Sequence, residues 1–107
     1  SILQWTVVVN RLNIEQIYDI YAEAKKLGIN YITYNDVFGY EEDKVIQLLR
    51  IRKSDYVIIN QQFEKIQKDN RCEKIVINNL ISYDGYEDGE ILHRNSIREK
   101  LLKLKNQ

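Results

Sequence analysis

The chain has 107 residues, of which 44% are hydrophobic and 30% charged, which predicts one globular domain over 1–107. Its 16 basic and 16 acidic residues cancel, so the overall charge does not indicate a nucleic-acid or membrane partner. A single cysteine and a single histidine exclude an internal disulfide and a thiolate or His-rich metal site. No apolar run reaches the roughly 18 residues of a membrane span, and no signal peptide is recognisable. With the lone thiol, these features predict a cytoplasmic location.

The first third of the chain predicts a βαβ unit. Residues 3–9 are rich in β-branched side chains, and three consecutive valines suggest a strand covered on both faces, as in a parallel sheet. Asn13 stands at a helix N-cap position with Gln16 in the capping-box position, and Gly28 ends the helical pattern. Residues 29–34 then form a second strand, so a right-handed crossover is expected.

The middle of the chain allows two interpretations. Acidic residues at 41–43 suit the first turn of a helix whose apolar face lies at 45–49. Residues 54–69 predict another helix, because Tyr56, Ile59, Phe63 and Ile66 recur at helical spacing. The short run 56–59 also fits a strand, but the series continues beyond strand length and favours the helix. Residues 74–78 predict the next strand.

The last third combines a turn-rich loop with a helix. Two Asp-Gly pairs lie within 82–90, and the apolar pairs at 80–81 and 91–92 could form a hairpin around them. Ser96 and Glu99 form a second capping box, followed by an apolar stripe of Ile97, Leu101 and Leu104. The predicted fold class is therefore α/β: a small, mostly parallel sheet of at least three strands with a βαβ crossover and a short C-terminal helix.

Polar residues follow the predicted strands at their carboxyl ends. Ligands of open α/β sheets bind outside this edge, where the amides and charges of these residues could hold a polar ligand. The candidate ligand-binding residues are Asn10, Arg11, Asn35, Asp36 and Asn78. The alternative is that Asn and Asp only form the turns that end the strands.

Two further groups of charged residues could carry chemistry. Acidic clusters at 36–43 and 84–90 could hold Mg²⁺ for a nuclease or phosphotransfer enzyme, but the second lacks the EF-hand order, and no metal site is predicted. The terminal helix is basic and could contact phosphates of nucleic acid. Its candidate residues are Arg94, Arg98, Lys100 and Lys103. Neither Cys72 nor His93 has a recognisable catalytic partner in the sequence.

The segments TVVVNRLNIEQI (6–17) and AKKLGINYITYND (24–36) resemble a βαβ segment of the radical SAM barrel. The helix at 54–69 and the strand at 74–78 extend the resemblance to about residue 80. The three-cysteine motif of that family is absent, since only Cys72 is present. The resemblance therefore implies a piece of a larger barrel-like protein, or a relative without the cluster. It also implies that the strand ends at Asn10, Asn35 and Asn78 face a ligand cavity.

Three function classes remain. The leading hypothesis is a non-catalytic binding or interaction domain, which could be part of a larger α/β enzyme. It requires no cofactor and allows a protein partner or self-association. The alternatives are a metal-dependent nuclease or phosphotransfer enzyme using the acidic clusters, and a nucleic-acid-binding protein using the basic helix. Nucleic acid ranks below protein as a partner, and no complete catalytic motif is present.

Overall fold

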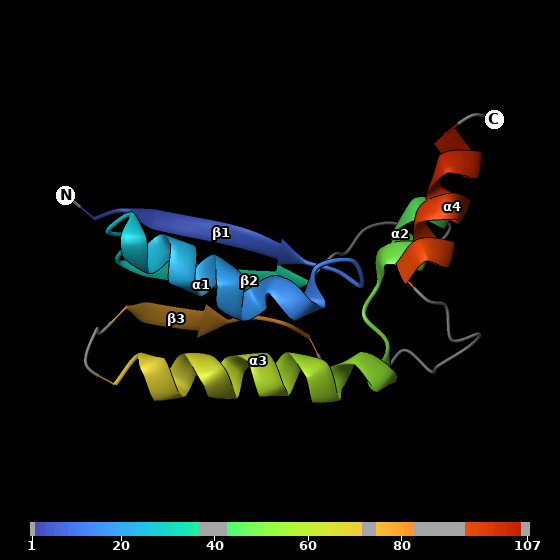
Figure 1. The fold of residues 1–107 in the computed structure, drawn as a ribbon. Coiled ribbons are helices and arrows are strands. Elements are labelled where there is room, and N and C mark those ends of the chain that lie inside the picture. Colours follow the sequence, from blue (N-terminus) through green and yellow to red (C-terminus); the bar gives the residue numbers. More distant parts are fainter. Residues whose placement is uncertain (1, 37–42, 72–74, 83–93, 106–107) are drawn as a thin grey trace.

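The computed structural model describes residues 2–36, 43–71, 75–82 and 94–105 (Figure 1). Its elements in chain order are β1 (Gln4–Val9), η1 (Ile14–Gln16), α1 (Ile17–Lys26), β2 (Tyr31–Asp36), α2 (Lys44–Leu49), η2 (Lys53–Asp55), α3 (Tyr56–Asp69), β3 (Val76–Asn79) and α4 (Arg94–Lys105). The strands form one parallel sheet in the order β1-β2-β3. The predicted α/β class is confirmed, and the ambiguous run at 56–59 is helical.

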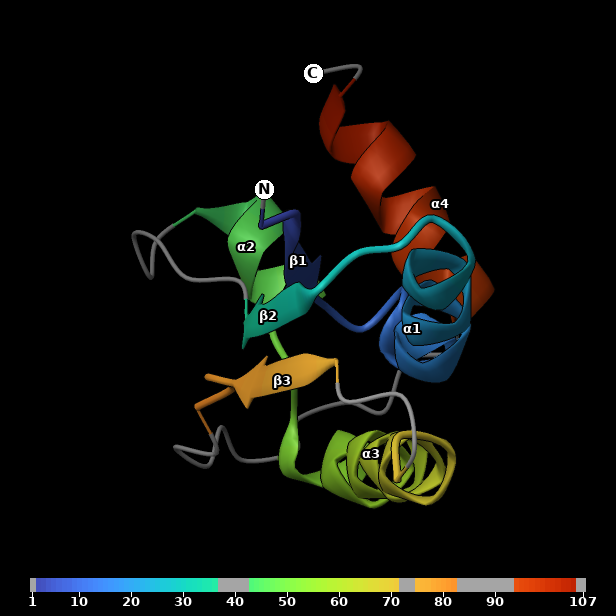
Figure 2. The same ribbon diagram turned by 90° about the vertical axis from the view of Figure 1, so that its left-hand side faces the viewer.

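Helices α1 and α3 lie on the same side of the sheet (Figure 2). Strand β1 alternates accordingly: Trp5 and Val7 pack against the core and Val9 is buried, whereas Gln4, Thr6 and Val8 are exposed. The expectation that the valine run is covered on both faces was therefore wrong for the described residues, because Val8 keeps 49% of its surface exposed. The chain crosses from β1 to β2 and then from β2 to β3, in the same direction along the sheet. Because crossovers between parallel strands share one handedness, both helices lie on the same face.

The core lies between this face and the two helices. Its largest buried side chains are those of Ile17 and Tyr21 from α1, Ile32 and Tyr34 from β2, and Ile59 and Ile66 from α3.

Tyr34 joins the sheet to both helices. Its hydroxyl donates a hydrogen bond of 2.9 Å to the carbonyl oxygen of Ile17, and its ring meets Phe63 edge-on at 5.2 Å between centroids. Burial raises the pKa of Tyr34 well above its ordinary value of 10.0. The hydroxyl therefore stays a hydrogen-bond donor at neutral pH.

The ends of the first helix differ in how well the sequence indicates them. Gly28 has φ +74°, and the amides of Gly28 and Ile29 donate to the carbonyls of Lys25 and Ala24, as in a Schellman motif. Asn13 does occupy the N-cap position of η1, but its side chain makes no capping bond. It instead donates to the carbonyl oxygen of Val8 and accepts from the amide of Asn10. The predicted capping box was wrong because this side chain holds the end of β1.

Helix α4 packs beside α2, away from the layer formed by α1 and α3 (Figure 1). Ile97 is buried, and Leu101 and Leu104 are half-buried. The helix begins at Arg94, so Ser96 lies inside it and not at its N-cap. The hairpin expected around the Asp-Gly pairs falls mostly outside the described residues. None of the described helices is long and apolar enough to span a membrane.

Candidate functional site

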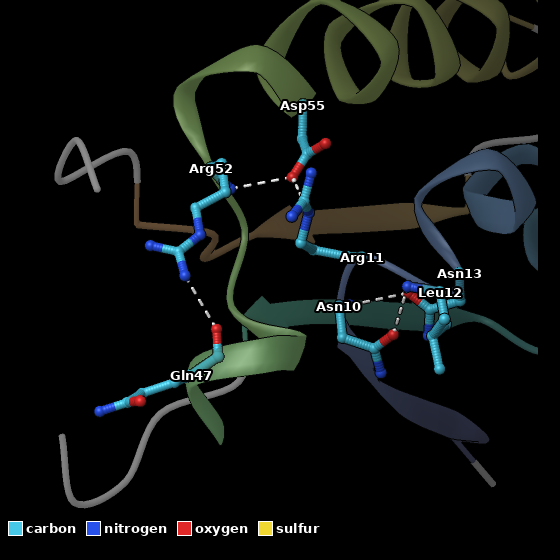
Figure 3. A network of polar contacts seen from close by, with 7 residues as sticks. All are labelled: Asn10, Arg11, Leu12, Asn13, Gln47, Arg52 and Asp55. Carbon is cyan, nitrogen blue, oxygen red and sulfur yellow. Dashed lines mark hydrogen bonds and ion pairs between the residues drawn. The ribbon is translucent and has the colours of Figure 1, made fainter. Parts of the chain in front are cut away.

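Asn10 forms the turn that follows β1. Its Oδ1 accepts a hydrogen bond of 2.8 Å from the amide of Leu12, and its own amide donates to Oδ1 of Asn13 at 2.8 Å (Figure 3). These bonds stabilise the turn between β1 and the first helix. The carboxamide oxygen of Asn10 is therefore engaged in the backbone of its own turn.

Arg11 forms a buried ion pair with Asp55. Its Nε lies 3.1 Å from Oδ2 of Asp55, and the two side chains are only 8% and 9% exposed. The same carboxylate oxygen accepts from the amide of Arg52 at 2.9 Å, while the amide of Arg11 donates to the carbonyl oxygen of Leu49 at 3.0 Å. Arg11 thus ties the end of β1 to the end of α2 and the start of α3 (Figure 3).

The other three strand residues do not converge on one point. Asn78 pairs with Thr33 in register and donates from Nδ2 to the hydroxyl of Tyr31. Asn35 lies two residues beyond Thr33 and so shares the face of the sheet opposite to α1 and α3. Asp36 is the next residue and falls on the other face. The sheet edge therefore brings together Asn35 and Asn78 at most.

A basic pocket lies between α2 and α4. It is open to solvent and has a volume of about 470 Å³. Its lining comes from two helices and the segment after α2: Lys44, Gln47, Leu48, Arg52, Lys100, Lys103 and Leu104. Four of these residues are cationic, and no acidic residue belongs to the described lining. Segments that are some fifty residues apart in the chain thus place four positive charges around one cavity.

Arg52 connects the pocket to the buried ion pair. Its guanidinium donates to the carbonyl oxygen of Gln47 at 2.9 Å, and its amide is held by Asp55 (Figure 3). Asp43 orders the other end of α2, where its carboxylate accepts from the amides of Val45 and Ile46. The N-terminal end of α2 is therefore capped by a carboxylate, and a carbonyl group near its C-terminal end is held by the guanidinium of Arg52.

The predicted nucleic-acid residues divide between the pocket and the rest of α4. Lys100 and Lys103 line the pocket, whereas Arg98 is exposed and does not belong to the described lining. Arg94 opens the helix, and its side chain is not among those described. The sequence did not predict that Lys44 and Arg52 belong to a site. Its only indication was that these two charged residues flank the apolar run of a helix.

The remaining candidates lie largely outside the described residues, including Cys72, His93, two of the four acids of the cluster at 36–43 and the whole cluster at 84–90. Within 2–36, 43–71, 75–82 and 94–105, no group of three or more His, Cys, Asp or Glu residues could hold a metal ion. Comparison of the chain with protein-family models, curated proteins and solved structures finds no match.

Proposed function

We propose that this chain is a binding domain that takes a multivalent anion in the pocket between α2 and α4. The observation that carries the proposal is that four cationic side chains, and no acid among the described lining, surround one cavity. The proposal narrows the broader hypothesis of a non-catalytic binding or interaction domain to one site.

Electrostatics supports an anion there. Like charges brought to one cavity repel each other, and an anion among them replaces this repulsion with charge-assisted hydrogen bonds. Each such bond contributes about 1.5–3 kcal/mol. Because the chain has no net charge, the attraction is local to the pocket.

The volume of the site and the chemistry of its lining fit a small anionic molecule. A volume of about 470 Å³ lies within the range of roughly 300–1,000 Å³ that is typical of small-molecule sites. Arg52 supplies a planar guanidinium suited to two oxygens of one anion, and Lys44, Lys100 and Lys103 supply point charges.

The likeness to a radical SAM segment stays a proposal about ancestry. The sequential strand order with α1 and α3 on one face is compatible with it. It supports no radical chemistry for this chain, since the three-cysteine motif is absent from the sequence.

The proposal is tested by titrating inorganic pyrophosphate into the protein at low ionic strength with isothermal calorimetry. We expect saturable binding that weakens as salt is added, because exposed charges are screened. Replacing both Lys44 and Lys103 by Gln should weaken binding at least tenfold. The matched control replaces Lys105 by Gln, since Lys105 follows on the same helix but does not belong to the described lining. An absence of binding, or equal binding by both variants, would reject the proposed function.

A further inference from the structure

We infer that the ligand of this pocket is a small phosphate ester with an apolar organic group, an inference that rests on the proposed function. The cations explain an anionic part of the ligand but leave two leucines of the lining without a role. Leu48 of α2 and Leu104 of α4 both belong to the pocket, and both side chains are half-buried. A purely inorganic anion would leave these apolar surfaces facing water.

Each of the two helices contributes a lysine and a leucine to the pocket. Helix α2 contributes Lys44 with Leu48, one turn apart, and α4 contributes Lys100 with Leu104 at the same spacing. Residues four apart lie on the same helix face. Each wall therefore offers a cation followed by an apolar surface, which matches a ligand with a charged head and an apolar body.

The anionic head is best matched by a phosphate. A phosphate monoester carries close to two negative charges at neutral pH and has three terminal oxygens. These oxygens can accept from the guanidinium of Arg52 and from lysines of both helices together. A single carboxylate has one charge and two oxygens, too few for four surrounding cations.

The lining argues against a nucleic-acid strand as the ligand. Sequence-tolerant binding of single strands relies on aromatic side chains on which bases stack, and no aromatic residue belongs to the described lining. Two acids also stand beside the pocket lysines in the chain: Asp43 precedes Lys44, and Glu99 precedes Lys100. They would repel an extended polyanion more than a compact one that stays within the cavity.

The test compares methyl phosphate with hexyl phosphate, which carry the same charge and differ in apolar length. Each buried methylene strengthens binding about fourfold, so partial burial of the hexyl chain should give at least a tenfold gain. The variant Leu104→Ala should remove most of this difference in affinity between hexyl and methyl phosphate. The control is Leu102→Ala on the same helix, because Leu102 is 59% exposed and lies outside the described lining.

The outcomes separate this inference from the proposed function. Equal affinity for methyl and hexyl phosphate, with pyrophosphate bound as proposed, would overturn the inference alone. Failure of pyrophosphate to bind would overturn the proposed function, and this inference with it. An oligothymidine that binds more tightly than hexyl phosphate, and whose binding needs Lys44 and Lys103, would make nucleic acid the ligand.

Two further measurements keep the test decisive. If far-UV circular dichroism shows that Leu104→Ala loses helix, Leu48→Ala on the opposite wall takes its place with the same expected result. Vesicles containing phosphatidic acid distinguish the source of the ligand. Vesicle binding together with hexyl phosphate binding assigns a lipid source, and hexyl phosphate binding alone assigns a soluble ester. Vesicle binding without hexyl phosphate binding would overturn the inference.

Discussion

The layer formed by the sheet with α1 and α3 and the end formed by α2 and α4 are held together in different ways. The layer contains nearly all of the described buried apolar residues, and its two helices pack directly against each other. Helix α2 contains no buried residue, and Ile97 of α4 is buried without being part of the main core. The first region is stabilised by apolar packing, and the second by one helix pair and a few polar links.

This difference shows where a binding site can form. A close-packed core leaves no space for a ligand, because its apolar side chains are already in contact with one another. A weakly packed helix pair can enclose a cavity and keep charged side chains at its wall, because little apolar packing depends on them. The buried pair of Arg11 and Asp55 joins the end of β1 to the start of α3. Its two residues also contact the second region, because the amide of Arg11 donates to Leu49 of α2 and Asp55 accepts from the amide of Arg52, which lines the pocket.

The largest effect should come from breaking that connection. Asp55→Ala leaves Arg11 buried without its carboxylate and should cost about 3–5 kcal/mol of unfolding free energy. It also removes the acceptor of the Arg52 amide. Urea denaturation measures the loss, and Asp19→Ala, at an exposed position of α1, should change stability by no more than about 0.5 kcal/mol. Similar losses for the two variants would show that the pair is not a structural link.

Core truncations should separate the two regions next. Ile59 of α3 is fully buried, so Ile59→Ala should cost about 2–5 kcal/mol. Leu101 of α4 is only half-buried, so Leu101→Ala should cost about 1 kcal/mol. Denaturation curves of the two variants give the comparison directly, and amide exchange should be faster in α4 than in α3. If Leu101→Ala proves as costly as Ile59→Ala, the two regions are equally well packed.

A smaller effect is expected at the end of α1. Gly28 has φ +74°, and a Cβ added there would meet no atom within 4 Å, so the cost of substitution is conformational. We expect Gly28→Val to lose about 1–2 kcal/mol, and Gly28→Asn less, because Asn adopts this conformation more readily. Thermal unfolding of both variants tests the order. No loss for Val would contradict the left-handed conformation on which the helix end depends.

The smallest effect concerns pH and reports on the core alone. Because the pKa of Tyr34 is raised in the folded protein, the unfolded chain releases this proton first. The contribution of Tyr34 is present below pH 10 and is lost as the pH rises above about 10 toward the folded value. Unfolding free energies measured from about pH 9 to 11.5 should fall more steeply for the native chain than for Tyr34→Phe. Parallel slopes would show that Tyr34 does not titrate as a buried group.

The local features of the fold were largely predictable from the sequence. Helical spacing at 56–66, the β-branched runs and Gly28 identified the βαβ unit and α3, because these signals depend on neighbours within about one or two turns. Asn13 shows the limit of such reasoning. Its position at the start of the helix was predicted correctly. Its side chain, however, bonds with the carbonyl oxygen of Val8 and the amide of Asn10 at the end of β1, and not with the amides of the helix.

The candidate site was less accessible to sequence reasoning. Asn10 and Arg11 were singled out for a ligand, yet their described contacts are with the turn after β1 and with Asp55. Lys100 and Lys103 were recognised as basic, but nothing local connects them to Lys44 and Arg52. That connection depends on which helix α4 packs against. An apolar stripe predicts that a helix packs against another element, but it does not indicate which one.

By itself, the sequence of this protein determined the parallel α/β arrangement, the crossover and the end of the first helix at Gly28, because periodicity and special residues act over short range. Only the tertiary structure decided that one face of the sheet is covered by both helices, that Arg11 pairs with Asp55, and that two distant helices share a basic pocket. These features arise from packing and from charge pairing between segments far apart in the chain. Their free energies depend on geometry that no local pattern encodes.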